Sequence, residues 1–255
     1  MTTRDLARRT ATDLSALLAA DSRAGFAWQQ RMWQIAVCLS ADASDDEALR
    51  AARTRFEGLY APGRDFADFH LWRPDPGERA AANARLESLT ARLRELLHMP
   101  PVTLRRARLT DADRLAAIWH AGWRDGHLGH VPDERVAVRT PENFRTRAAA
   151  RVTEATVAEV GGVVGGFVVV AGDEVEQVFV EASFRGGGVA DALLTEAERL
   201  VAADGHAVAW LAVVPGNARA RRFYERSGWA DDGAFDYVAS SVTVPCLRYV
   251  KRVGS

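Results

Sequence analysis

Hydrophobic positions in the first hundred residues recur at helical spacing. Across residues 5–98, apolar side chains stand three or four positions apart and alternating runs are scarce, beginning with Leu6, Leu14, Leu17 and Leu18. Segment 44–47, Ser-Asp-Asp-Glu, has the form of a capping box, and segment 75–78, Asp-Pro-Gly-Glu, combines a capping aspartate with a proline suited to the first helical turn. The pattern predicts an all-α region over residues 1–98.

The pattern changes after residues 98–101, His-Met-Pro-Pro, because each proline lacks an amide donor and pushes the preceding residue toward extended geometry. An alternating stretch over 102–109 is followed by a helix to about Arg124. Three apolar runs, joined by short glycine-containing turns, then read as an antiparallel meander over 155–160, 163–170 and 175–180. The chain is therefore expected to have a smaller all-α domain, 1–98, followed by an α/β (α+β) domain, 102–255.

Composition and charge narrow the class of partner. Hydrophobic residues make up 48% and charged residues 26% of the 255 residues, as in soluble globular proteins. Lys and Arg number 33 against 34 Asp and Glu, so the chain lacks the basic excess of a nucleic-acid or membrane-surface binder. Lys251 is the only lysine, and we interpret the many arginines as a compositional bias whose members form solvated faces.

The two cysteines, Cys38 and Cys246, lie in different predicted domains and have no Cys or His at metal-ligand spacing. Both are expected to be buried thiols, and no metal is expected. The N-terminal segment lacks the apolar stretch of a signal peptide or a transmembrane helix, so we expect a cytoplasmic protein.

One segment has the pattern of a phosphate-binding turn. The run Arg-Gly-Gly-Gly-Val-Ala, residues 185–190, follows an apolar strand that ends at Val180 and precedes a helical run over 191–203. Glycine lets the backbone approach a ligand closely, and the amides at a helix N-terminus favour a pyrophosphate. A plain tight turn would also use such glycines, so the surrounding residues decide the interpretation.

Those surroundings resemble the GNAT superfamily of acyl-CoA-dependent N-acetyltransferases. Arg185, Gly188 and Ala190 match its acyl-CoA signature of Arg or Gln, two residues, Gly, one residue, and Gly or Ala. Downstream, a predicted strand over 208–213 precedes segment 217–229, which resembles the family's second signature with its Asn, Phe-Tyr pair and closing Gly-aromatic. The resemblance runs from Val102 to the last predicted strand, and it implies a GNAT-type mixed, mostly antiparallel sheet flanked by helices.

The resemblance implies acetyl-CoA as co-substrate and assigns residues to it. Backbone groups of Val178, Phe179 and Val180 would lie along the pantetheine arm, and Asn217 and Tyr224 would lie near the thiol. The pyrophosphate would be held by amides of Arg185, Gly186, Gly187, Gly188, Val189 and Ala190. Tyr224 would also be the general acid, because a departing thiolate needs a proton from a fixed donor.

An amine attacks only when it is unprotonated, so such enzymes provide a base or a water chain that ends on a carboxylate. Glu174 is the first candidate, because many members of the family carry a glutamate at this strand position. Strand alternation predicts that Glu174, Glu176 and Val178 share one side of the strand. A solvated charge at a strand start is the alternative for Glu174.

The acceptor pocket is expected where the family places it, in the helix and loop after the first strand, with Trp119, Trp123, His127 and His130 as substrate-binding candidates. These aromatic residues favour a small-molecule amine, such as an amino acid derivative or a natural product. A peptide acceptor, with the helical domain as its docking module, and an acyl-CoA sensor without catalysis are the alternatives. The helical region itself could cover the acceptor cleft, form a homodimer or bind a partner.

Overall fold

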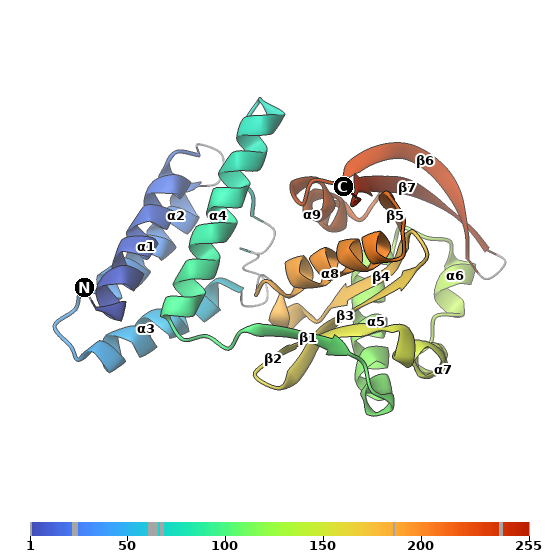
Figure 1. Cartoon of the computed structure of the whole chain (residues 1–255), viewed down its shortest axis with the longest axis horizontal. Helices are drawn as coiled ribbons and strands as arrows, with labels where there is room; N and C mark the ends of the chain where they lie inside the picture. The colour runs from blue at the N-terminus through green and yellow to red at the C-terminus, as the bar shows by residue number, and fades with distance from the viewer. Residues whose placement is uncertain are drawn as a thin grey trace. The chain divides into compact units, whose positions relative to one another are not determined.

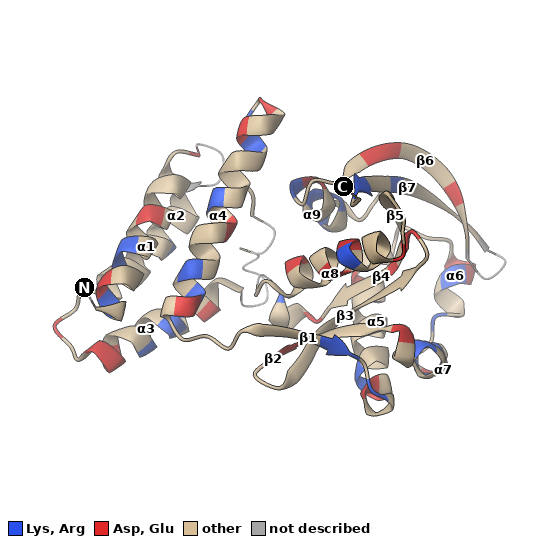
Figure 2. Cartoon of the chain, viewed as in Figure 1, with Lys and Arg blue, Asp and Glu red and all other residues tan. Residues whose placement is uncertain are grey.

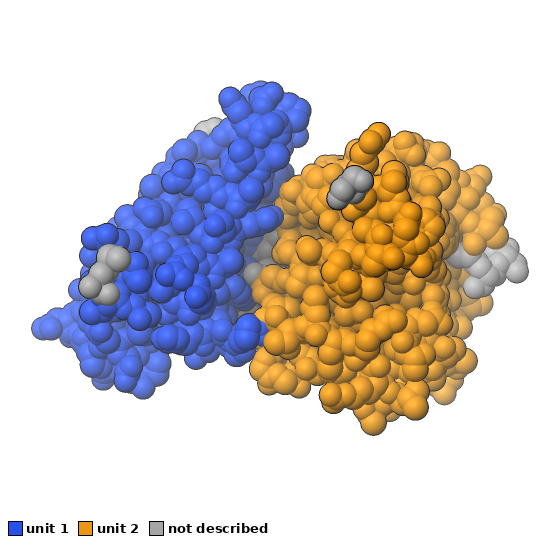
Figure 3. Space-filling view, in the orientation of Figure 1, with its two compact units in different colours: residues 1–101 blue, residues 102–255 orange. Residues whose placement is uncertain are grey.

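The computed structural model describes residues 2–21, 25–60, 66, 69–185, 187–239 and 242–254. The chain divides into two compact units, Met1–Pro101 and Val102–Ser255, which are coloured separately in Figure 3. Each unit has its own hydrophobic core.

Unit 1 is helical in its described part, as the hydrophobic spacing predicts. It contains α1 (Thr3–Ala19), α2 (Gly25–Cys38), α3 (Asp45–Glu57), the short 3-10 helix η1 (Gly58–Tyr60) and α4 (Pro76–Leu96) (Figure 1). The capping box at Ser44 and Glu47 forms, and the Asp75 side chain accepts a hydrogen bond from the Glu78 amide at 2.8 Å. These caps fix the starts of α3 and α4.

A buried asparagine ties α4 to the extended segment before it. The Asn83 side chain accepts a hydrogen bond from the Leu71 amide and donates one to the Leu71 carbonyl, both at 2.9 Å. Asn83 and Leu71 are both buried, so the amide and carbonyl of Leu71 depend on this side chain for satisfaction.

We predict that Asn83→Ala lowers the free energy of unfolding of unit 1 by about 2 to 4 kcal/mol, because two buried backbone groups lose their partner. Urea unfolding followed by tryptophan fluorescence measures the change. Arg85→Ala, on the exposed side of the same helix, serves as the control and should change stability by less than about 0.5 kcal/mol. Equal effects of the two substitutions would contradict this role for Asn83.

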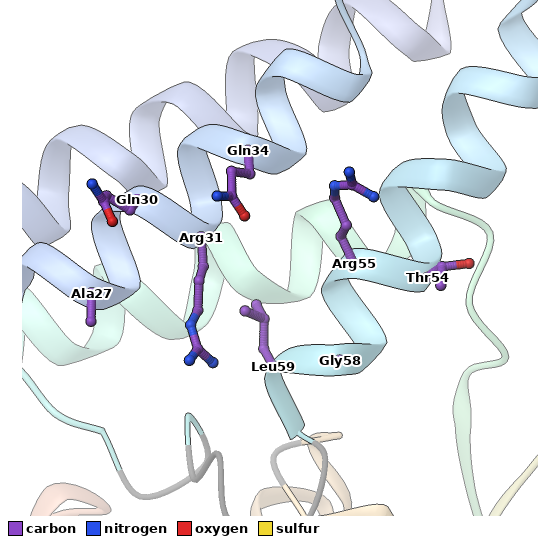
Figure 4. A pocket seen from close by; sticks show the side chains of 8 residues that line it. All are labelled: Ala27, Gln30, Arg31, Gln34, Thr54, Arg55, Gly58 and Leu59. Carbon is purple, nitrogen blue, oxygen red and sulfur yellow. The ribbon is translucent and has the colours of Figure 1, made fainter.

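Unit 1 also has an open surface pocket of about 550 Å³. Its lining comes from α2 on one side and from α3 and η1 on the other (Figure 4). The lining residues combine amide, guanidinium and aliphatic groups: Ala27, Gln30, Arg31, Gln34, Thr54, Arg55, Gly58 and Leu59.

Unit 2 is built on a seven-stranded sheet in the order β1-β2-β3-β4-β5-β7-β6. The strands are β1 (Val102–Arg106), β2 (Thr156–Val160), β3 (Val163–Ala171), β4 (Glu174–Val180), β5 (Val208–Val213), β6 (Ala230–Ala239) and β7 (Val242–Arg252). Neighbouring strands pair antiparallel except β4 and β5, which are parallel. The predicted mixed, mostly antiparallel sheet is confirmed.

Helices cover both faces of this sheet (Figure 1). The chain runs through η3 (Leu109–Asp111), α5 (Ala112–His127), α6 (Asp133–Ala137), α7 (Pro141–Arg151) and η4 (Val152–Glu154) before β2. After β4 come η5 (Ala182–Phe184) and α8 (Val189–Ala203), and α9 (Ala218–Arg226) follows β5. Successive residues of β3 alternate between the faces: Phe167 and Val169 pack with α5 and α7, whereas Val168 packs with α8.

Basic and acidic residues are interspersed over both units (Figure 2). No helix in the described ranges is long and apolar enough to cross a membrane. Among the same residues, no three His, Cys, Asp or Glu side chains are grouped as metal ligands. Cys246 is buried, as expected, but Cys38 is only half-buried.

Candidate active site

The two parallel strands at the centre of the sheet separate soon after they meet. β4 and β5 are in register only at Glu174 and Trp210, where the Trp210 amide donates to the Asp173 carbonyl at 3.0 Å. From this point to Val180, β4 continues to pair with β3 along one of its edges. Its other edge, over residues 175–180, therefore presents peptide groups that have no partner strand in the described sheet, and these can hydrogen-bond an extended ligand.

A bulge in β4 changes which side chains share a face. Gln177 pairs with Val169 and Val175 pairs with Val170, so Glu176 is an extra residue in β4. Val178 packs on the α8 face. Because the bulge shifts the alternation by one residue, Glu174 lies on the opposite face, with α5 and α7. The prediction that Glu174 and Val178 share one side is wrong, because strict alternation does not hold across a bulge.

The glycine-rich segment leads directly into α8. Gly188 precedes the helix with φ +79°, a left-handed conformation that glycine adopts without strain, and no side chain caps the helix. The first amides of α8, which include Val189 and Ala190, have no acceptors within the helix and carry the positive end of its dipole. Gly187 is described and its amide donates to the Phe184 carbonyl at 3.3 Å, whereas the predicted Gly186 lies outside the described residues.

The Arg185 side chain points to α5. It donates to an Asp125 carboxylate oxygen at 2.6 Å, and Arg219 lies 3.9 Å from the same oxygen. The Arg185 guanidinium is thus held in an ion pair between the glycine-rich segment and α5.

Asn217 and Tyr224 stand at the start and near the end of α9. Asn217 caps the helix, with its side-chain oxygen accepting from the Ala220 amide at 3.1 Å, and its side chain packs against Gly126 of α5. The Tyr224 ring is buried beside Trp229 and Tyr249, with ring centroids 6.2 and 6.0 Å away. Burial raises the pKa of the Tyr224 phenol, and its hydroxyl makes no hydrogen bond with any described residue. The phenol therefore keeps its proton at neutral pH.

Glu174 has a partner that the sequence did not indicate. Tyr237 of β6 donates from its hydroxyl to a Glu174 carboxylate oxygen at 2.9 Å. Burial of Glu174 raises its pKa above the ordinary value of 4.5, the Tyr237 hydrogen bond lowers it in part, and the nearby charge of Glu176 raises it again. Glu174 is thus a half-buried carboxylate with an increased affinity for a proton.

Residues 115–229 match the model of the GNAT acetyltransferase family. Unit 2 therefore contains a GNAT acetyltransferase domain over these residues. The matched range contains the separated strands, the glycine-rich segment and α9, and it identifies the chain as an acyltransferase.

Solved structures that are similar to this GNAT domain include three N-acetyltransferases. The first is a GCN5-related enzyme from Rhodopseudomonas palustris, with 20% identity and a TM-score of 0.49 over 60% of this chain and 97% of that chain. An N-acetyltransferase from Staphylococcus aureus has 17% identity and a TM-score of 0.47, and the match covers 60% of this chain and 99% of that chain. The PaiA N-acetyltransferase from Thermoplasma acidophilum was solved in complex with coenzyme A. It has 15% identity and a TM-score of 0.44, and the match covers 60% of this chain and 99% of that chain. No protein with a curated description matches the chain.

The predicted acceptor residues of the GNAT domain differ in exposure. Trp119 and Trp123 are buried in the core between α5, α7 and the sheet. His127 stacks on Trp123 at 4.9 Å, and its Nδ1 lies 2.9 Å from the Trp123 carbonyl, which accepts a hydrogen bond when Nδ1 carries the proton. Burial lowers the pKa of His127 to about 4, so the ring is neutral at pH 7. His130 is exposed, and its ring lies against Gly216 in the connection between β5 and α9.

The interpretation that arginines form solvated faces is wrong for two of them. Arg135 and Arg139 are each only 6% exposed. They lie in α6 and just after it, on the α5 and α7 side of the sheet, and were not recognised because neither α6 nor α7 was predicted. A lone arginine in the sequence carries no signal of burial, since burial depends on which elements pack around it.

Proposed function

We propose that this chain transfers the acetyl group of acetyl-CoA to a primary amine of a small molecule. The observation that carries the proposal is the separation of β4 from β5, with the uncapped N-terminus of α8 just beyond the end of β4. An unpaired strand edge of peptide groups followed by a cluster of helix amides suits a ligand with a pantetheine arm and a pyrophosphate.

In this proposal the chain holds acetyl-CoA mainly through its backbone. Peptide groups of Val178, Phe179 and Val180 bind the pantetheine arm, and amides between Arg185 and Ala190 bind the pyrophosphate. The Arg185 side chain, paired with Asp125, fixes the segment to α5. The Arg185 amide donates to the Ala182 carbonyl at 3.3 Å, so it must exchange this partner to bind the pyrophosphate. Asn217, as the cap of α9, positions the helix that carries Tyr224.

The reaction is a direct attack. The amine nitrogen forms a bond to the thioester carbonyl carbon, the C–S bond breaks, and the sulfur takes the electron pair. Tyr224 donates its proton to the departing sulfur, and the proton lost by the amine passes to Glu174, directly or through water. Tyr224 is then reprotonated from solvent and Glu174 releases its proton to solvent, so both residues are restored and the products are the amide and free CoA thiol.

Glu174→Gln should shift the acidic limb of the kcat/KM profile to higher pH. Glu174 acts as a base only when it is ionised, and its pKa is raised, so activity of the native enzyme falls as the pH drops through that raised pKa. Glutamine cannot accept the proton, and the acceptor must then lose it to water. Glu142→Gln, at an exposed carboxylate of α7, is the control and should leave the profile in place. An unshifted profile in Glu174→Gln would leave Glu174 a structural role only.

Two assays separate a small-molecule acceptor from a peptide acceptor. Thiol release from acetyl-CoA is measured with a panel of small primary amines and, in parallel, with a peptide library. We expect release with one class of small amines. Release with peptides alone would overturn the small-molecule proposal, and acetyl-CoA binding without release in either assay would indicate a sensor.

A further inference from the structure

Four arginines gather on the face of the sheet that carries Glu174. Arg135 lies in α6, Arg139 just after it, and Arg147 and Arg151 lie in α7. The four side chains influence one another electrostatically. The charges of Arg147 and Arg135 lower the pKa of Arg139. The charges of Arg135 and Arg151 lower the pKa of Arg147. Arginines of α6 and α7 appear in blue in Figure 2.

Carboxylates lie unevenly around this arginine cluster, and the charge of Glu176 acts on Arg147 as well as on Arg151. Arg151 forms ion pairs with Glu154 and Glu176. Within the part of the chain that the structure describes, neither Arg139 nor Arg147 forms an ion pair with a carboxylate. Arg139 donates a hydrogen bond from its side chain to the neutral amide oxygen of Asn143 at 3.0 Å.

Among the residues that the structure describes, no acceptor lies within hydrogen-bond distance of two buried nitrogens of the cluster, Nε of Arg139 and Nε of Arg147. Arg147 also lies with its guanidinium carbon 4.6 Å from the centroid of the Trp119 ring, which holds the group in a fixed orientation. Burying a guanidinium without a counter-charge is unfavourable. Burial and the two neighbouring arginines accordingly lower the pKa of Arg139 to about 9. An anion bound there would supply the missing acceptors.

The arginine cluster adjoins the proposed base. Tyr237, whose hydroxyl donates to Glu174, interacts electrostatically with both Arg135 and Arg147. Glu176, one residue beyond Val175 in β4, is paired with Arg151. A molecule whose amine reaches Glu174 can therefore place a second group among the arginines.

We propose that the acceptor amine carries an anionic group, a carboxylate or a phosphate, which Arg139 and Arg147 bind with the support of the Arg135 charge. This inference rests on the proposed acetyl transfer. The planar guanidinium presents paired donors that match either anion. The site thus selects amines by a second, negatively charged group and disfavours polyamines.

The test compares amines that differ only in that group. Thiol release is measured with 4-aminobutanoate against 4-aminobutanamide, and with phosphoethanolamine against ethanolamine, which also separates carboxylate from phosphate. In at least one of the two pairs, we expect kcat/KM for the anionic amine to be at least about tenfold higher than kcat/KM for its neutral analogue. In Arg147→Gln this ratio falls by about tenfold or more, mainly through KM. In Arg145→Gln, an exposed arginine of the same helix paired with Glu142, the ratio is retained.

A second measurement does not depend on transfer. Calorimetric titration of the free protein with the same anionic amines should show binding that Arg147→Gln weakens and Arg145→Gln does not. If no amine releases thiol, the proposed acetyl transfer fails, and this titration still decides whether the cluster binds an anion. Equal kcat/KM for anionic and neutral amines, or unchanged binding in Arg147→Gln, would overturn the anion site.

Discussion

Replacing Tyr224 with phenylalanine should lower kcat for acetyl transfer by about 100-fold or more, the range that general acid catalysis contributes. The departing sulfur then lacks its proton donor, whereas the ring keeps its packing beside Trp229 and Tyr249. In our proposal, backbone groups of β4 and α8 provide most of the contacts with acetyl-CoA. Its dissociation constant should therefore change by less than about threefold, which is about 0.7 kcal/mol. Thiol-release kinetics and calorimetry measure the two quantities.

Tyr249→Phe is the matched control. The Tyr249 hydroxyl donates to Glu225 at 2.8 Å and accepts from Arg221 at 3.3 Å, so its loss affects the packing of α9 on β7. We expect this substitution to cost about 1 kcal/mol of stability and to leave most of the turnover. A Tyr224→Phe enzyme with native turnover would exclude Tyr224 as the acid.

Gly188→Val should weaken acetyl-CoA binding by about tenfold or more. A β-branched residue at φ +79° is strained, and nothing within 4 Å of the added Cβ opposes it sterically. The segment can relieve the strain, on the order of 1 to 3 kcal/mol, by leaving the left-handed conformation, which turns the amides away from the pyrophosphate. For every 1.4 kcal/mol by which this strain reduces the binding free energy, the dissociation constant for acetyl-CoA rises about tenfold.

The other end of α8 offers a control of the same kind. Gly205 follows the helix with φ +90° and also has open space around its Cβ position. Gly205→Val therefore introduces similar strain away from the glycine-rich segment and should lower stability without changing acetyl-CoA affinity. Equal loss of affinity in both variants would show that Gly188 acts through general stability and not through the loop conformation.

The parts of the site that could be predicted are those formed by consecutive residues of the chain. A strand, a glycine-rich turn and a helix start are recognisable over residues 175–203 because each has a local signal. Segment 217–229 is recognised by its resemblance to the family's second signature, and in the structure its Asn217 caps α9. The core elements of the GNAT fold could therefore be predicted before the structure was known.

The acceptor side of the site could not be predicted in the same way. Strand β6, which carries Tyr237, has three aspartates and a glycine among its ten residues and lacks a hydrophobic pattern. The bulge at Glu176 exists only in the pairing of β4 with β3, so strict alternation placed Glu174 on the wrong face. The arginine cluster joins α6 and α7 with β4 and β6, and contacts of this kind have no signature in local sequence.

The most direct test of acetyl transfer is calorimetric titration of the purified protein with acetyl-CoA, followed by thiol release with a panel of primary amines. We predict saturable binding at one site per chain and thiol release that one class of amine stimulates. Absence of acetyl-CoA binding would contradict the assignment of residues 185–190 and the edge of β4 to the cofactor, and binding without release by any amine would contradict acetyl transfer to a small molecule.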